Sequence, residues 1–361
     1  MTTDQQQEAF EFTSDWRQFA PIGFTNLLLC IVTLGIYTFW ARTRERRYLW
    51  SNTRFIDDRL EWTGTGLELL IGYVLAIILF GVPVAVLQFG LQSLAIRGYG
   101  AAAAGIGVTL YFALLYMIGI AIFRALRYRL SRSYWRGIRG GSDSQGFGFG
   151  FSYLWRTIVG AFAFGLLVPW SMVSLWNQRW NAMSFGPMPF ESNARVGPVF
   201  ARYLLFYLAP IIMLVLFGVL AFLGFAGAIG QVAPTPQQLQ QNVIFIAVGT
   251  YLLFFVVFGL IALVFYSAYF REVISQLTLG DLSFEFTATS WDWFKLVFGS
   301  LLLVVFTLGI GQIFVGYRNW TFFIRHMRAY GEVRIDTLTQ SATREPGQGE
   351  GLPDAFDVGA F

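Results

Sequence analysis

The sequence predicts an all-α polytopic membrane protein with internal repeats. We expect four full transmembrane helices, three broken or re-entrant helical segments and small cytoplasmic β elements. The first observation is composition, because 56 % of the residues are hydrophobic and 13 % are charged, whereas soluble domains carry roughly 25 % charged residues. The second observation is a set of long runs almost without charge. The third is a pair of motifs that returns at a fixed distance along the chain.

Four apolar runs reach the ~20 residues that a helix needs to cross the hydrocarbon of a bilayer. Backbone polar groups in lipid must be bonded within the protein, so helices are the expected conformation. The four predicted spans are 67–92, 101–123, 203–230 and 243–269.

The motif pair indicates that the chain is built from repeats. Phe-Glu-Phe-Thr at 10–13 returns at 284–287, and Thr-Leu-Gly-Ile at 33–36 returns at 307–310, both shifted by 274 residues. We expect a first membrane repeat, then an Arg-rich loop with a second repeat, a third partial repeat and a polar tail that is disordered because it has few apolar residues. These four parts are 1–123, 124–269, 270–336 and 337–361.

Each repeat also contains a broken apolar run, at 22–40, 157–176 and 296–317, with breaking residues at Thr33-Leu34-Gly35, Val168-Pro169 and Thr307–Gly311. If these runs are re-entrant, 24 of the 25 basic residues face the cytoplasm, against 18 of 25 if all seven runs are simple spans. The positive-inside rule favours re-entrant segments and a cytoplasmic C-terminus. Seven simple spans are the alternative.

Short aromatic alternations precede the broken runs and predict strands with one buried face. They are Phe10–Thr13, Phe149–Ser152 and Phe284–Thr287, with a looser form at Leu60–Thr63. The Gly-Phe alternation at 146–151 also predicts a short strand. We expect these strands to form a small cytoplasmic cap.

Clusters of arginine follow the apolar runs, and tyrosine and tryptophan lie between them. The alternation with aromatics is typical of a membrane interface, and juxtamembrane basic clusters attract anionic lipids. Nucleic-acid binding is not expected, because the clusters stay at the ends of apolar runs. The candidate lipid-binding residues are Arg42, Arg44, Arg46, Arg47, Arg124 and Arg127.

Interrupted apolar segments in corresponding positions of repeats indicate a transport site in many carriers. The leading functional hypothesis is therefore a channel- or transporter-like protein. The alternative is a non-transporting scaffold that binds anionic lipids or a cytoplasmic partner through its arginines, and a homo-oligomer is left open. Candidate pathway or hinge residues are Asn26, Thr33, Gly35, Pro169, Gly309 and Gln312.

No enzyme signature is present in the sequence. His326 is the single histidine and Cys30 the single cysteine, so one chain offers no multi-histidine or thiolate metal site and no disulfide framework. We predict that the protein is not an enzyme and uses no cofactor.

Several motifs resemble the YjgN-like family of bacterial inner-membrane proteins, a domain of unknown function. The resemblance is carried by Thr33–Tyr37, Phe39–Arg42, Arg47–Thr53 and Thr63–Gly66, and more loosely by Tyr317–Trp320. It implies a multi-pass protein of the bacterial inner (plasma) membrane and supplies no substrate, cofactor or catalytic residue. The second repeat departs from the pattern, because Val168-Pro169-Trp170 stands where Leu-Gly-Ile is expected.

Overall fold

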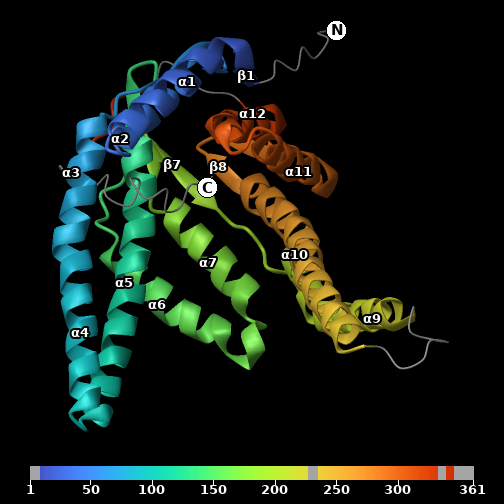
Figure 1. Cartoon of the computed structure of the whole chain (residues 1–361). Coiled ribbons are helices and arrows are strands. Elements are labelled where there is room, and N and C mark those ends of the chain that lie inside the picture. Colours follow the sequence, from blue (N-terminus) through green and yellow to red (C-terminus); the bar gives the residue numbers. More distant parts are fainter. Residues whose placement is uncertain (1–8, 227–234, 332–338, 345–361) are drawn as a thin grey trace. The chain divides into compact units, whose positions relative to one another are not determined.

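The computed structural model describes residues 9–226, 235–331 and 339–344. It divides into two compact units. The first contains residues 1–194, 273–287 and 300–361, and the second contains 195–272 and 288–299. Each unit is described by itself (Figure 1).

The described part of the first unit is organised around a ten-stranded antiparallel sheet whose strands follow one another in chain order. The two ends of the sheet approach each other, because the ring of Phe10 in β1 lies 6.4 Å from that of Phe284 in β9, the neighbour of β10. The strands are β1 (Phe10–Phe12), β2 (Thr53–Phe55), β3 (Asp58–Trp62), β4 (Ser133–Trp135), β5 (Ile138–Gly141), β6 (Ser184–Phe185), β7 (Met188–Ser192), β8 (Leu277–Leu279), β9 (Leu282–Phe286) and β10 (Met327–Tyr330).

Two kinds of connection alternate along this sheet. Tight turns join β2 to β3, β4 to β5, β6 to β7 and β8 to β9. In the β4–β5 turn Arg136 and Gly137 both have positive φ, at 52° and 72°, as a two-residue hairpin of right-handed twist requires. Pairs of helices make the other connections, so each helical pair leaves one strand and returns to its neighbour.

Three of these connections are short helical hairpins. They are α1 (Trp16–Val32) with α2 (Thr38–Ser51), α6 (Phe147–Ala161) with α7 (Val168–Trp180), and α11 (Ser290–Phe306) with the 3₁₀ turn η3 (Ile310–Phe314) and α12 (Val315–His326). At each tip an apolar residue in the left-handed region precedes a glycine of positive φ. The pairs are Leu34-Gly35, Phe164-Gly165 and Leu308-Gly309.

Two expectations for the second broken run are wrong. The chain reverses at Phe164-Gly165, whereas Pro169 lies in the first turn of α7, where a missing N–H costs nothing. The Gly-Phe alternation at 146–151 begins helix α6 instead of a strand. Phe147 and Phe151 are exposed and Phe149 is buried, because positions i and i+4 share one face of a helix.

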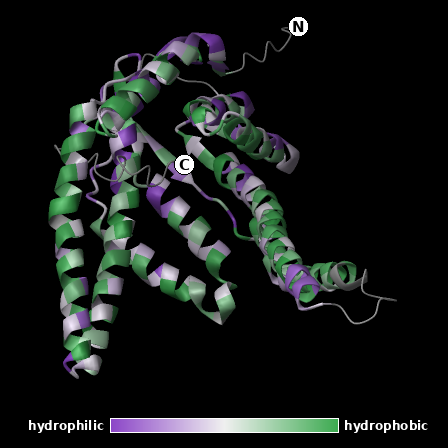
Figure 2. Ribbon diagram, viewed as in Figure 1, coloured by the Kyte–Doolittle hydropathy of each residue, from purple (hydrophilic) through white to green (hydrophobic). Residues whose placement is uncertain are grey.

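The other two connections are long. In the first unit α3 (Gly66–Ala76), the π-helical turn η1 (Ile77–Gly81) and α4 (Val82–Ile96) run beside α5 (Gly100–Arg132). The predicted loop of the Arg-rich 124–156 segment is therefore partly helical. In the second unit α8 (Gly197–Tyr203) and α9 (Leu205–Ala226) precede α10 (Pro236–Ser275). Figure 2 shows apolar residues along most of the length of these helices.

The predicted fold class is wrong in two respects. Its alternative of seven simple spans is also wrong. The ten-stranded sheet means that the protein is not all-α. Among the described residues three helices, and not four, are long and apolar enough to cross a membrane: Gly100–Arg132, Gly197–Leu223 and Pro236–Ser275. The predicted span at 67–92 is divided by η1 into two shorter helices. Pro83 follows this turn and lacks the N–H that a continuous α-helix needs.

The core of the first unit lies where α5 and α6 meet the sheet. Phe123 and Trp135 are each 1 % exposed, and the indole Nε1 of Trp135 donates to the carbonyl of Phe55 at 2.9 Å. Phe149 and Phe190 belong to the same cluster. This cluster therefore joins α5 and α6 to the sheet.

Part of the predicted disordered tail is described and makes specific contacts. Gln340 donates to the carbonyl of Gly137 at 2.8 Å and accepts from the backbone N–H of Arg139 at 3.1 Å. A guanidinium nitrogen of Arg127 donates to the carbonyl of Arg344 at 3.3 Å. Residues 332–338 and 345–361 lie outside the described residues.

Candidate functional site

The tips of the short hairpins are the most exposed apolar side chains of the described structure. Leu34 and Leu308 are each 94 % exposed and Phe164 is 97 % exposed. Burying such a side chain in an apolar medium is favourable by about 1.5–3 kcal/mol. Three such side chains therefore leave apolar surface uncovered at three equivalent turns.

Hydroxyl groups complete the backbone hydrogen bonds of two tips. Thr33 Oγ1 donates to the carbonyl of Leu29 at 2.7 Å and accepts from the N–H of Tyr37 at 3.0 Å. Thr307 Oγ1 donates to Leu303 at 2.6 Å and accepts from Gly311 at 2.7 Å. Backbone N–H and C=O groups at helix ends that lack a hydrogen-bond partner cost free energy where water is scarce. The threonine hydroxyls supply such partners, as a turn surrounded by lipid requires.

Four of the candidate pathway residues therefore take part in reversing the chain or restarting a helix: Thr33, Gly35, Pro169 and Gly309. Gln312 is exposed in the turn that follows the third tip. Asn26 is buried between α1 and α2 and contacts Arg44, whose Nη1 lies 3.5 Å from Asn26 Oδ1. Their role as a transport pathway stays a prediction.

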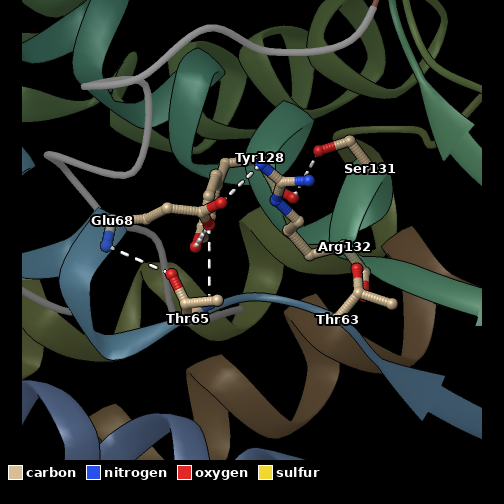
Figure 3. Close-up of polar contacts among 6 residues, drawn as sticks. All are labelled: Thr63, Thr65, Glu68, Tyr128, Ser131 and Arg132. Carbon is tan, nitrogen blue, oxygen red and sulfur yellow. Dashed lines mark hydrogen bonds and ion pairs between the residues drawn. The ribbon is translucent and has the colours of Figure 1, made fainter.

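A polar cluster closes the foot of the first long connection (Figure 3). Arg132 on α5 contacts Glu68 on α3 with 2.8 Å between Nη2 and Oε1, and the hydroxyl of Tyr128 donates to the other carboxylate oxygen at 3.0 Å. Thr65 caps α3 and exchanges hydrogen bonds with Glu68 in a capping box. The side chains of Arg132 and Glu68 are only 20 % and 24 % exposed. The cluster fixes the two helices to each other where they leave the sheet.

The same foot contains a backbone contact that recurs in other hairpins. The residue after the incoming strand donates both its N–H and its hydroxyl to the carbonyl just before the returning strand. For Thr63 and Arg132 the distances are 3.0 and 3.3 Å. For Thr13 and Asn52 they are 3.0 and 3.2 Å, and for Thr287 and His326 they are 2.9 and 3.2 Å.

This contact explains the threonine at the end of the Phe-Glu-Phe-Thr motif, for which the sequence alone indicates no role. The recurrence of threonine at 13, 63 and 287 is the feature of the sequence that indicates this contact. His326 also belongs to this structural contact, and its Nδ1 lies 2.8 Å from the carbonyl of Phe322.

A further contact joins the first turn of α12 to the residue before the foot of α1. The hydroxyl of Tyr317 donates to the carbonyl of Ser14 at 3.0 Å. Trp320 Nε1 donates to Thr53 Oγ1 at 2.8 Å, and its ring stacks on Trp50 with centroids 4.0 Å apart.

The six candidate lipid-binding arginines differ in how exposed their side chains are. Arg44 and Arg47 of α2 are exposed, whereas Arg42 and Arg46 are half-buried and Arg46 lies over the ring of Trp62 at 5.1 Å. Arg127 is 0 % exposed, and it does not lie on a lipid-facing surface.

Arg124 is half-buried on α5. Its Nε donates to the carbonyl of Gln145 at 3.1 Å. Across the described residues no group of three or more His, Cys, Asp or Glu side chains is arranged to hold a metal ion. That the protein is not an enzyme stays a prediction.

Long apolar helices and helical hairpins with apolar tips, mounted on a sheet, define a membrane protein. The chain belongs to the family described as bacterial protein of unknown function (DUF898), which it matches over residues 7–355. It is 29 % identical over 101 residues to the inner membrane protein YjgN of Salmonella typhimurium (strain LT2). That alignment covers 28 % of this chain and 26 % of the relative. The predicted YjgN-like family is confirmed. No solved structure matches the chain.

Proposed function

We propose that the protein is a multi-pass scaffold of the bacterial inner membrane that holds anionic lipids around the feet of its helical hairpins. The observation that carries this proposal is the set of three apolar tips, each more than nine-tenths exposed. In this arrangement the hairpins lie in lipid and the sheet lies outside the hydrocarbon.

The lengths of the helices support this placement. Helix α1 has 17 residues and α2 has 14, which corresponds to about 20–25 Å at 1.5 Å per residue. The hydrocarbon core is about 30 Å thick. Strands β1 and β2 are neighbours in the sheet, so this hairpin enters and leaves on the same side. Its tip reaches into the core without reaching the opposite interface.

Charge supports a cytoplasmic sheet and a cytoplasmic C-terminus. Arg54, Arg59 and Arg136 lie in or beside the first strands, and Arg325 and Arg328 lie beside the last. Arginine is enriched on the cytoplasmic side of inner-membrane proteins. Juxtamembrane arginines also attract anionic lipid of a negatively charged leaflet, and Arg44 and Arg47 of α2 are the exposed contacts.

The test is the thermal stability of the purified protein in neutral detergent with added lipid. We expect phosphatidylglycerol to raise the Tm more than phosphatidylcholine does, and high salt to remove the difference because surface charges are screened. Substituting Arg44 and Arg47 with glutamine is expected to reduce the difference in Tm between the two lipids. Equal stabilisation by the two lipids at low salt would refute the proposal. Binding of a cytoplasmic partner or formation of a homo-oligomer stays a prediction.

A channel or transporter is the second candidate, favoured by the contact of the buried Asn26 of α1 with Arg44 of α2. Polar groups at membrane depth often mark a solute path. Reconstituted vesicles loaded with ion-sensitive dyes test this candidate. Flux that disappears in Asn26→Leu at unchanged protein abundance supports it, and the absence of flux for every ion tried counts against it.

A further inference from the structure

The three short hairpins share one feature besides their tips, which is an arginine at a fixed distance from the tip glycine. Arg44 lies nine positions after Gly35, and Arg318 lies nine positions after Gly309. Arg156 lies nine positions before Gly165. The second hairpin thus carries its arginine on the first helix instead of the second, at the same distance from the tip.

Each of these arginines contacts a polar group on the opposite helix of its own hairpin. Arg318 Nε donates to Ser300 Oγ at 3.1 Å, and Arg44 Nη1 lies 3.5 Å from Asn26 Oδ1. In the second hairpin Arg156 Nη1 donates to the carbonyl of Ser174 at 3.0 Å. The partners Asn26, Ser174 and Ser300 also lie nine positions from their tip glycines. The distance between arginine and tip is therefore the same in all three hairpins, although the arginine lies on the first helix in one hairpin and on the second helix in the other two.

This distance matches a boundary within the bilayer. Nine residues of helix cover about 14 Å, and half of the hydrocarbon core is about 15 Å. In a hairpin whose tip lies at the midplane, the guanidinium therefore lies where the hydrocarbon ends and the phosphate groups of one leaflet begin. A topology anchor alone does not require a partner across the hairpin that orients the guanidinium.

We propose that Arg44, Arg156 and Arg318 form three equivalent sites, each of which binds the phosphate of one anionic phospholipid. The contact within the hairpin engages a single nitrogen of each guanidinium, which has five N–H donors in a fork suited to phosphate. None of the three side chains is buried. The inference rests on the proposed function, because it requires the hairpins to lie in lipid.

The test is native mass spectrometry of the full chain, released from detergent after equilibration with phosphatidylglycerol. The variants are Arg44→Gln, Arg156→Gln, Arg318→Gln and the triple substitution. Arg59→Gln is the matched control, because Arg59 is an exposed arginine of strand β3. We expect each single variant to retain one tightly bound lipid fewer than the wild type, and the triple variant three fewer. The control is expected to match the wild type, and excess inorganic phosphate is expected to displace none.

The outcomes separate this inference from the proposed function. A wild type that retains no lipid overturns both. A wild type that retains lipid, with a triple variant that retains as many, overturns the three sites alone. If a glutamine variant does not fold, the corresponding lysine variant keeps the charge but lacks the fork. It is then expected to lose its lipid at lower salt than the wild type, and unchanged salt resistance contradicts the proposal.

Discussion

At the scale of single residues, the polar side chains with resolved roles close the helical hairpins at their feet and tips. Thr13, Thr63 and Thr287 bond the two ends of a hairpin at the sheet, and Thr33 and Thr307 complete the tips. Both places need donors and acceptors supplied by the protein, because little water reaches a tip in lipid. Threonine provides a donor and an acceptor in a small volume.

The ion pair at the foot of α3 gives a prediction at this scale. Glu68→Gln removes the charge that Arg132 and Tyr128 contact, and we expect it to lower the free energy of unfolding by about 1.5–3 kcal/mol. Glu61→Gln is the matched control, because Glu61 is exposed on β3. Thermal unfolding in detergent measures both. A loss in stability that is equal for the two variants would contradict the role of the cluster.

A second prediction concerns the tip glycines. A Cβ at Gly35 meets no atom within 4 Å, but its φ is +91°. Gly35→Ala is therefore expected to cost roughly 1–2 kcal/mol through backbone strain alone. Gly90 on α4 is equally unobstructed but has no positive φ, so Gly90→Ala is expected to be neutral or stabilising. Thermal unfolding measures the stability of the two alanine variants. Equal stability would mean that the backbone at the tip is not strained.

At the scale of elements, the hairpins are attached to one another as well as to the sheet. Gly119 of α5 and Gly150 of α6 allow close approach, because a Cβ at either would lie 2.6 Å from a side-chain atom of the other helix. The contact between α12 and the foot of α1 and α2 joins the beginning and the end of the sheet. It uses the indole of Trp320 and the hydroxyl of Tyr317.

Trp320→Phe tests this attachment, because it keeps an aromatic ring near Trp50 and removes the hydrogen bond to Thr53. We expect a loss of about 1 kcal/mol in the free energy of unfolding. Trp291→Phe is the control, since Trp291 is 61 % exposed. Unfolding followed by intrinsic fluorescence compares the two. If Trp320→Phe is as stable as the control, the indole hydrogen bond does not stabilise the closure.

At the scale of the whole molecule, the sequence indicates most of the helices, two of the three tips and the strands β1, β3 and β9, but not the ten-stranded sheet. The other strands have two to five residues and show no clear alternation, and paired strands such as β7 and β8 are separated by α8, α9 and α10. The break at Phe164-Gly165 was missed because Pro169 is the stronger breaker in sequence. The arginines at the feet were visible, but the burial of Arg127 depends on tertiary contacts.

We propose that the short hairpins lie in hydrocarbon while the sheet lies in water. The most direct measurement is labelling with a membrane-impermeant maleimide in oriented membrane vesicles, on a Cys30→Ser background. Single cysteines replace Leu34, Phe164 or Leu308 at the tips and Asp58, an exposed residue of β3. We expect Asp58→Cys to react only from the cytoplasmic side, and the three tip cysteines to react from neither side until detergent is added. A tip cysteine that reacts from either side of intact vesicles would contradict the account.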